Sequence, residues 1–515
     1  MSGSSPTGDA PSLDSVVREI LRAQVYEVAV ETPIDYMPRL SRRLDNHVNL
    51  KREDLQPVFS FKLRGAFNKL NRMSAPERRR GVVAASAGNH AQGVALAASI
   101  LGIKATIVMP TTTPSIKVEA VSQRGATVVL HGDAFDDARL HAEVLCATTQ
   151  AVMIPPYDDA DIIAGQGTVG MEILRQHTGR LDAVFVPVGG GGLIAGIAAY
   201  IKYVRPEVQV IGVEAEDSAC LAAAMAAGRP VDLERVGLFA DGVAVRRIGT
   251  APFQICKDHV DSVVTVTTDE ICSAIKDVFD DTRSIAEPAG ALAVAGVTRW
   301  VAETGTRGAS VVAIHSGANV NFGRLRHIAE RVAAGDAREA ILAVTIPESP
   351  GSFRRFCELL GPRNVTEFNY RYGDDNSAQV YVGVGLAGAP DARAALVTAL
   401  EADGYGVVDL SDNEMAKVHI RHMVGGKSVA VADERVSHFI FPERPGALMR
   451  FLTELGARWN ISMFHYRNHG AGYGRVLVGM QVPKQERAAW LAAAKTLGYP
   501  FSDETDNPAY RLFLA

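Results

Sequence analysis

Short apolar segments alternate with segments of helical periodicity over much of the first 333 residues. From Gly81 onward, each apolar run is followed by a stretch whose apolar positions recur every three or four residues. This alternation is typical of parallel strands joined by covering helices, because a parallel strand is buried on both faces. The pattern predicts strands at 82–85, 105–109, 127–130, 183–188, 208–213 and 310–314, and helices at 90–101, 115–124 and 193–203.

The last third of the chain contains an internal repeat. The sequence PESPGSF at 347–353 returns as PERPGAL at 442–448, and NVTEFNYR at 364–371 returns as NISMFHYR at 460–467. Each copy has the order strand, Pro-Gly turn, helix, Asn turn and further extended segments, which predicts a ferredoxin-like βαββαβ unit. A paired module without an evident catalytic group, appended to an α/β body, favours binding or regulation.

These patterns divide the chain into five parts. A chain of 515 residues is too long for one ordinary core, so several domains are expected. The first residues are rich in Ser, Gly and Pro and lack the basic start and apolar run of a signal peptide. We expect a flexible leader at 1–25, an α/β domain at 26–333, a polar linker at 334–339, and two modules at 340–425 and 437–515.

Composition narrows the classes of partner and compartment. The net charge is −5 at pH 7, with no basic excess to neutralise a phosphate backbone, so nucleic acid is not an expected partner. No apolar run is long enough to cross a bilayer, so no membrane association is expected. The five cysteines are odd in number and never spaced as C-x-x-C, which predicts neither a disulfide framework nor a metal site. A cytoplasmic location fits these features best.

One lysine stands between phenylalanines. Lys62 follows Phe61 in the sequence VFSFKLRGAF at 58–67, where the neighbouring side chains exclude water. Burial disfavours the charged ammonium and lowers its pKa, so a neutral amine becomes available to react with an aldehyde or to remove a proton. The alternative is a lysine that extends its charged end to solvent beside an aromatic patch.

Four consecutive glycines form a second candidate site. Gly189, Gly190, Gly191 and Gly192 lie between a predicted strand and the helix that begins at Leu193. Backbone N–H groups of such a loop converge on an anion at the positive end of the helix. The same residues also satisfy the dinucleotide pattern Gly190-x-Gly192-x-x-Ala195, with Glu214 after the next strand. A nicotinamide-dependent oxidoreductase is therefore the alternative interpretation.

Two further turns follow predicted parallel strands. Ser86, Ala87, Gly88, Asn89 and His90 open a helix and form a second anion site, of a size that suits a carboxylate. Ser316 presents a hydroxyl at the carboxyl end of another strand, where ligands of open α/β sheets bind. An amine, a phosphate cradle, a carboxylate site and a neutral partner for a ring nitrogen together match the needs of pyridoxal 5′-phosphate.

The same motifs carry a family resemblance. The chain resembles the threonine/serine dehydratases of fold type II, whose catalytic domain has the tryptophan synthase β-like fold, and the resemblance extends over almost everything after residue 25. With the repeat, it is similar to the biosynthetic threonine deaminases, which carry tandem ACT-like regulatory modules of α+β ferredoxin-like fold. The motifs that carry the resemblance are SFKLRGA at 60–66, SAGNHAQGVA at 86–95, GGGGL at 189–193, AEPAGA at 286–291 and SGAN at 316–319.

The resemblance implies a role for each site residue. Lys62 would bind the cofactor aldehyde covalently and act as the base, with Phe61 against the cofactor and Ser316 at the pyridine nitrogen. The remaining cofactor contacts would be Asn89 at the ring hydroxyl and Gly189, Gly190, Gly191, Gly192 and Leu193 at the phosphate. The substrate carboxylate would bind at Ser86, Ala87, Gly88, Asn89 and His90. Glu287 would lie near the cofactor, in a role that stays open.

The resemblance also implies an activity and its control. L-threonine would be converted to 2-oxobutanoate and ammonia, the first step of isoleucine biosynthesis, and L-serine is the competing substrate that the sequence does not separate from threonine. Isoleucine would inhibit and valine would oppose it at the repeat, where Tyr370 and Tyr466 occupy matching positions. A homotetramer is expected. The alternatives are the oxidoreductase above and a non-enzymic amino-acid sensor.

Overall fold

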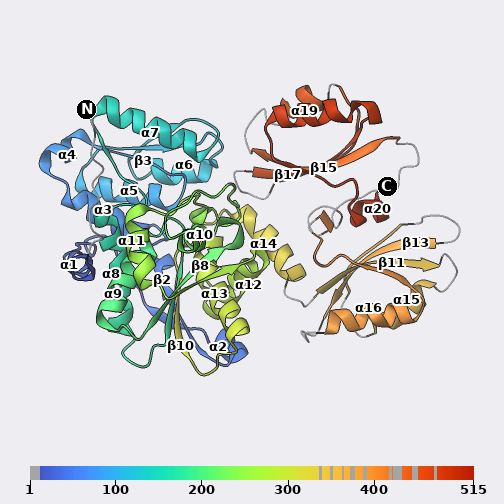
Figure 1. The fold of residues 1–515 in the computed structure, drawn as a ribbon, viewed down its shortest axis with the longest axis horizontal. Helices are drawn as coiled ribbons and strands as arrows, with labels where there is room; N and C mark the ends of the chain where they lie inside the picture. The colour runs from blue at the N-terminus through green and yellow to red at the C-terminus, as the bar shows by residue number, and fades with distance from the viewer. Residues whose placement is uncertain are drawn as a thin grey trace. The chain divides into compact units, whose positions relative to one another are not determined.

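The computed structural model describes residues 12–514, apart from 336–338, 348–351, 362, 364, 372–376, 387–390, 414, 417–419, 421–431, 443–449, 457 and 469–472. The chain forms two compact units, residues 1–320 and 321–515, and each is described by itself (Figure 1). The expected boundary near Ala333 falls inside helix α14 (Phe322–Gly335), which belongs to the second unit.

The first unit contains a six-stranded sheet that is parallel except at one edge. Its order is β1 (Ile34–Tyr36), β2 (His47–Arg52), β10 (Ser310–His315), β7 (Ala183–Pro187), β8 (Gln209–Ala215) and β9 (Ser262–Val266), with β1 antiparallel to β2. Helix α13 (Pro288–Thr304) contacts β7, β8, β9 and β10. The other helices around this sheet are α2 (Pro38–Leu44), α8 (Ala160–Gln176), α9 (Gly192–Val204), α10 (Cys220–Ala227), α11 (Thr250–His259) and α12 (Thr268–Thr282).

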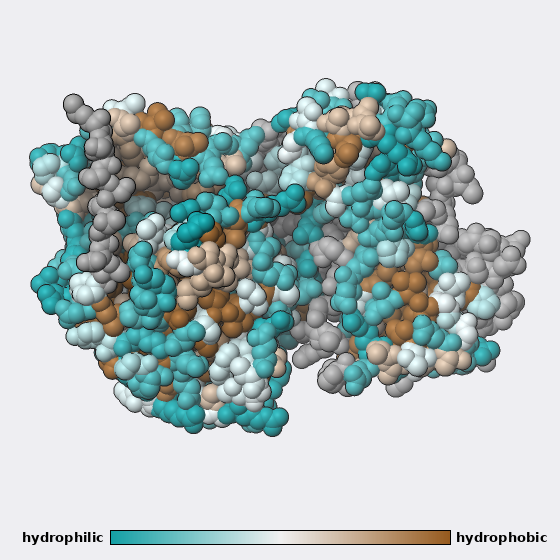
Figure 2. Space-filling view, viewed as in Figure 1, coloured by the Kyte–Doolittle hydropathy of each residue, from teal (hydrophilic) through white to brown (hydrophobic). Residues whose placement is uncertain are grey.

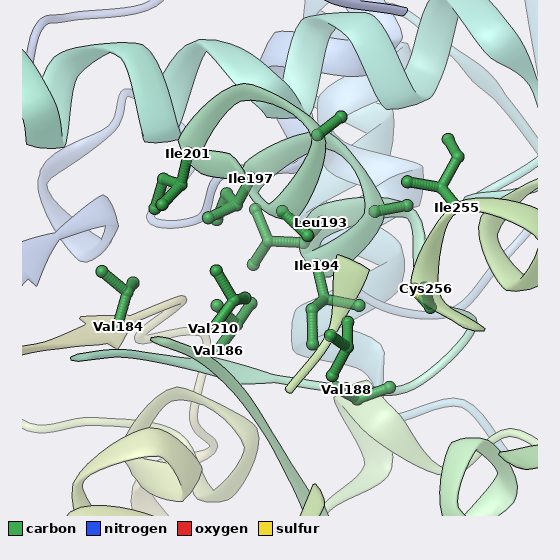
Figure 3. Packing of buried hydrophobic residues seen from close by; sticks show 14 of the residues in the cluster. Val184, Val186, Val188, Leu193, Ile194, Ile197, Ile201, Val210, Ile255 and Cys256 are labelled. Carbon is green, nitrogen blue, oxygen red and sulfur yellow. The ribbon is translucent and has the colours of Figure 1, made fainter. Parts of the chain in front are cut away.

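The packing of α9 shows how this sheet is held. Leu193, Ile194, Ile197 and Ile201 point from the helix onto the valines of β7 and β8 (Figure 3). These side chains belong to one apolar cluster with the valines of the sheet and are almost wholly buried. Each such side chain contributes about 1.5–3 kcal/mol on burial, so the sheet fixes the position of the turn from which α9 begins.

A four-stranded parallel sheet forms the second layer of the first unit. Its order is β5 (Thr127–Leu130), β4 (Ala105–Met109), β3 (Val82–Ala85) and β6 (Val152–Met153). One face packs on α3 (Lys62–Arg72) and α5 (Asn89–Leu101), and the other on α7 (Phe135–Thr149). The remaining short elements of the unit are α1 (Leu13–Leu21), α4 (Ala75–Arg80), α6 (Ser115–Ser122), η1 (Glu53–Leu55), η2 (Glu216–Ser218) and η3 (Asp241–Val243).

Helix α7 carries several exposed apolar side chains. Phe135, Leu140 and Val144 are about half exposed, and hydrophobic side chains gather over this helix in the space-filling view (Figure 2). Leu140 and Val144 lie one turn apart on the side of the helix away from Ala138 and Ala142, which are buried against the sheet. Among the described residues, no helix has both the length and the apolar character that a membrane span requires.

The expected flexible leader is wrong for part of its length. Helix α1 is capped by Ser12, whose hydroxyl accepts from the Ser15 N–H, and its apolar residues Val17 and Ile20 are buried. The Ile20 side chain packs where a methyl group on Gly167 of α8 would lie 2.5 Å from it. Apolar residues three positions apart were the sequence signal for this helix.

The second unit contains two ferredoxin-like modules, which confirms the predicted fold. The first consists of β11 (Glu339–Pro347), α15 (Ser352–Leu360), β12 (Val365–Arg371), β13 (Ser377–Gly385), α16 (Ala392–Ala402) and β14 (Gly406–Asp409). The second consists of β15 (Glu434–Pro442), η5 (Leu452–Gly456), β16 (Ile461–Asn468), β17 (Tyr473–Gln481), η6 (Lys484–Glu486), α19 (Arg487–Leu497) and β18 (Phe501–Asp503), followed by α20 (Pro508–Phe513). The antiparallel orders β12-β13-β11-β14 and β16-β17-β15-β18 are equivalent.

The sequence repeat is also a repeat of backbone detail. The pairing of β12 with β13 shifts register between Val365 and Glu367, and that of β16 with β17 shifts between Ile461 and Met463. In each sheet, alternate residues of the first strand pack under that module's own helices. The opposite faces contribute Ile341 and Val436, with Tyr510 of α20, to one shared apolar cluster.

Candidate functional site

Lys62 is the first residue of α3, directly after a backbone segment that reaches the sheet. Its Nζ donates to the Pro156 carbonyl at 2.9 Å and lies 5.3 Å from the centre of the Phe61 ring. Burial lowers the pKa of the Lys62 amine to about 8, and the nearby Glu287 carboxylate partly opposes that shift. At neutral pH about a tenth of such an amine is unprotonated, which is far more than for an exposed lysine.

A short antiparallel pairing joins the lysine segment to the serine segment. Ser60 forms a bridge with Gly317, the Phe61 N–H donates to the Ser316 carbonyl at 3.3 Å, and the Ala318 N–H donates to the Phe59 carbonyl at 2.9 Å. Phe59 adopts a left-handed φ of 56°, which bends the chain into this pairing. Two motifs that are far apart in the sequence are thereby held side by side.

Ser316 presents a buried hydroxyl at the end of β10. The Ser316 side chain is 4% exposed, and its Oγ donates to the Ala289 carbonyl at 3.2 Å. The neighbouring Ser60 hydroxyl is fully buried and has no hydrogen-bond partner among the described residues. A buried hydroxyl left unpaired costs free energy, which indicates a ligand atom at this position.

The glycine loop between β7 and α9 is enclosed by two residues that the sequence did not single out. Only Gly191 has a left-handed φ, of 88°. A methyl group at Gly190 would lie 2.0 Å from Cδ1 of Tyr157, and one at Gly189 would lie 3.0 Å from the Cα of Val243. The loop therefore requires glycine mainly because Tyr157 and the turn at Val243 approach so closely.

The segment 154–159 lies against several parts of the site. It supplies the Pro156 carbonyl that accepts from Lys62 and the Tyr157 ring beside Gly190. Asp158 accepts from the Thr250 and Ala251 N–H groups at the start of α11. Sequence analysis missed this segment because the strand that precedes it, β6, is only two residues long and gives no periodic signal.

The SAGNH turn connects β3 to α5 as predicted. The Ser86 Oγ accepts from the Gly88 N–H at 3.2 Å, and Asn89 begins the helix. His90 turns away from this loop, and its Nε2 lies 2.9 Å from the Ile154 carbonyl. Burial lowers the pKa of His90 to about 3, so the ring is neutral and serves to anchor the segment 154–159.

The Asn89 amide is bonded at both ends. Its Nδ2 donates to Glu287 Oε1 at 2.5 Å, and its Oδ1 accepts from Asn319 Nδ2 at 2.7 Å. Asn319 Nδ2 also donates to the Val58 carbonyl at 2.8 Å. Four of the motifs identified in the sequence, those around Lys62, Asn89, Glu287 and Ser316, thus converge on one place.

Glu214 does not have the geometry that a ribose-binding acid needs. Its two carboxylate oxygens accept from the Leu221 and Ala222 N–H groups at 2.7 and 2.9 Å, so it caps α10. Burial raises the pKa of Glu214 to about 7. Since Tyr157 also covers Gly190 and Gly192, the geometry gives the nicotinamide interpretation no support.

The two candidate regulatory tyrosines lie at equivalent positions of the second unit. Tyr370 of β12 is opposite Val380, and Tyr466 of β16 is opposite Val476. Their side chains lie outside the part of the chain whose side chains the structure describes. The backbone therefore shows the equivalence of the two positions and nothing of their contacts.

The site residues of the first unit fit pyridoxal 5′-phosphate. A partly neutral amine, a glycine cradle without side chains and a buried serine hydroxyl occupy one site. Two family models match the chain: "Pyridoxal-phosphate dependent enzyme" over residues 26–317, and "C-terminal regulatory domain of Threonine dehydratase" over residues 330–420 and 425–514.

Named relatives match over the whole length. The biosynthetic L-threonine dehydratase of Escherichia coli is 53% identical over 515 residues, covering 100% of both chains, and that of Burkholderia multivorans is 53% identical over 502 residues, covering 97% of this chain and 99% of the relative. The chloroplastic enzyme of Arabidopsis thaliana is 50% identical over 495 residues, covering 96% of this chain and 83% of the relative.

A solved structure agrees for the first unit. The processed form of threonine deaminase isoform 2 from Solanum lycopersicum is 47% identical with a TM-score of 0.61, and the match covers 63% of this chain and 94% of that chain. The family models and the full-length relatives lead to one assignment. The chain belongs to the pyridoxal-phosphate-dependent enzyme family, in the branch that carries the threonine dehydratase regulatory domain.

Proposed function

We propose that this protein is a biosynthetic threonine dehydratase that converts L-threonine to 2-oxobutanoate and ammonia. The observation that carries the proposal is the Lys62 amine, whose pKa is lowered to about 8 and which is held beside Ser316 by the pairing of Ser60 with Gly317. Full-length relatives that are named biosynthetic L-threonine dehydratases support the choice of substrate.

The cofactor supplies an electron sink for the bond that breaks at the substrate α-carbon. Lys62 receives the proton from that carbon, a task for which its lowered pKa suits it. The N–H groups of Gly189 to Leu193 hold the cofactor phosphate at the start of α9, where the helix dipole favours an anion. Ser316 would face the pyridine nitrogen as a neutral group, and Phe61 would pack beside the cofactor ring.

The substrate is held at the start of α5. We propose that Ser86, Ala87, Gly88, Asn89 and His90 form the carboxylate site at the positive end of α5, while Asn89 also reaches the cofactor ring oxygen. The His90 side chain takes no part, because it is neutral and faces Ile154. L-serine, which lacks one methyl group, is proposed as a second and poorer substrate.

Control is proposed to reside in the second unit. Its family model is a regulatory domain, which supports small-molecule effectors. We propose isoleucine as inhibitor and valine as its opponent, with Tyr370 and Tyr466 at the effector sites, in a cytoplasmic homotetramer. The regulated reaction would then be the first step of isoleucine biosynthesis.

A lysine substitution tests the activity directly. We expect Lys62→Ala to lower turnover of threonine by more than a thousandfold, because both the covalent attachment and the base are lost. Lys104→Ala, which removes an exposed lysine, is the matched control and keeps normal turnover. The assay is formation of 2-oxobutanoate with added pyridoxal phosphate, and normal turnover in the Lys62 variant would refute the proposal.

A further inference from the structure

Glu287 occupies an unusual position at the start of α13. It is the N-cap residue of that helix, yet its side chain makes no capping bond to the helix N–H groups. The carboxylate instead accepts from the Asn89 amide at 2.5 Å, across a sequence separation of almost two hundred residues. Glu287 is only 5% exposed, so this carboxylate is buried without bonding to the N–H groups at the helix N-terminus, which would stabilise its negative charge.

The surroundings leave room for this carboxylate and for little else. A methyl group at Gly317 would lie 2.4 Å from Glu287 Oε1, and one at Gly242 would lie 3.7 Å from the same atom and 4.0 Å from Asn89 Nδ2. Both glycines belong to turns that line the Lys62 site. Glycine at position 317 is therefore explained by the contact between Glu287 and Asn89, whereas a methyl group at Gly242 would first meet Cβ of Ala289, at 2.9 Å.

The orientation of the Asn89 amide is fixed from both sides. The Val58 carbonyl can only accept, so the Asn319 atom that bonds to it at 2.8 Å is the nitrogen Nδ2. That same nitrogen contacts Asn89 at 2.7 Å, so the Asn89 atom there is the oxygen. The Asn89 nitrogen then faces Glu287, and an ionised carboxylate accepts its hydrogen.

This arrangement determines what Asn89 offers to a ligand. An amide nitrogen carries two hydrogens, and Glu287 takes one of them. The second N–H, to which the described residues give no acceptor, is the group that remains for the site. If the Asn89 amide were reversed, its oxygen would face the Glu287 carboxylate. Both groups are acceptors, so no hydrogen bond could form between them.

We propose that Glu287 is a positioning residue that fixes the Asn89 amide as a hydrogen-bond donor to the ring oxygen of the cofactor. The proposal rests on the proposed function, in which Asn89 contacts that oxygen. Glu287 then acts through Asn89, while its charge also offsets a positive charge at the Lys62 nitrogen. A ring oxygen held by a donor is bound in its ionised form, which is the form that absorbs in the visible range next to a lysine-linked aldehyde.

The test is a double-mutant cycle on the full-length protein. The variants are Glu287→Gln, Asn89→Ala and the two combined, with Glu303→Gln at the exposed far end of the same helix as the control. Glu287→Gln keeps the size of the side chain but replaces the charged acceptor with a neutral amide, so the Asn89 N–H is held less strongly in place. The readouts are the dissociation constant for pyridoxal phosphate, from absorbance titration, and the position of the visible band.

We expect Glu287→Gln and Asn89→Ala each to weaken cofactor binding about tenfold, and the double variant to be no weaker than Asn89→Ala. Glu303→Gln should match the wild type. Losses that multiply in the double variant, or a Glu287→Gln protein with unchanged affinity and band, would overturn the positioning role. A wild-type protein that shows no visible band would instead refute the proposed function.

Discussion

At the scale of single residues, the glycine loop depends on one aromatic ring. Gly190→Ala would place a methyl group 2.0 Å from Cδ1 of Tyr157, so either the ring or the loop must move. We expect the affinity for pyridoxal phosphate to fall at least tenfold, measured by absorbance titration. Gly179→Ala is the matched control, because nothing lies within 4 Å of a methyl group there.

A second change identifies the cause of that loss. If the Tyr157 ring is the obstacle, the double variant Gly190→Ala/Tyr157→Ala should regain part of the lost affinity. An affinity no better than that of the single variant would show that the loop needs the glycine for another reason.

The lysine pKa gives a prediction about pH. Only the neutral amine attacks an aldehyde, and burial places the pKa of Lys62 at about 8 in the protein without cofactor. The rate of cofactor uptake should therefore rise with pH and level off above about 8. Glu287 is the charged group near Lys62 that opposes the shift, and His90 is neutral throughout this range, so a single transition is expected. A rate independent of pH between 6 and 9 would contradict the assignment.

Most of the residues at the site could be predicted from the sequence, and what was missed depends on contacts that only the tertiary fold creates. Lys62, Asn89, Ser316 and the glycine loop stand in motifs at the ends of strands or helices, where local sequence reveals them. Tyr157 was missed because it contacts the site only through the tertiary fold. Glu287 was expected near the cofactor, but its contact with Asn89 could not be predicted because the two residues are remote in the sequence.

At the scale of elements, α3 is anchored by a buried cluster of charges. The Arg64 guanidinium donates to Glu53 at 2.8 Å and to Glu172 at 2.6 Å, and Lys51 of β2 donates to Glu172 at 2.6 Å. All four side chains are fully buried. The two positive and two negative charges balance, so the first turn of α3, which carries Lys62, is joined to η1, β2 and α8.

Removal of one partner should be costly. Arg64→Ala leaves two carboxylates with one lysine in the interior, and we expect the free energy of unfolding to fall by about 3–5 kcal/mol. Denaturant unfolding of the protein, analysed at the transition in which the first unit unfolds, measures this change in free energy. Arg180→Ala, which removes an exposed pair with Asp182, should cost less than about 1 kcal/mol. Similar losses for both variants would contradict the anchoring role.

Some of the strands that sequence analysis missed have charged or very short sequences. Strand β2 has the sequence HVNLKR. Its side chains Lys51 and Arg52 are buried because they donate hydrogen bonds to Glu172 and Asp54. Strands β1 and β6 have three and two residues, too few to show alternation. Strands such as β4 were predictable, since continuous apolar residues report burial on both faces.

At the scale of the whole molecule, regulation requires that the second unit bind an effector. We expect Tyr370→Ala and Tyr466→Ala in the full-length protein to raise the isoleucine concentration for half-inhibition at least tenfold at one of the two positions, because a proposed effector site would lose its aromatic side chain. Turnover without effector should stay unchanged, and Tyr36→Phe, an exposed tyrosine of β1, is the control. Unaltered inhibition in both variants would refute the effector sites.

The most direct test of the account is to trap the cofactor on its lysine. Borohydride reduction of the protein loaded with pyridoxal phosphate, followed by proteolysis and mass spectrometry, shows which side chain carries the group. The account predicts a single labelled peptide with the modification on Lys62. A label on another lysine, or none, would contradict it.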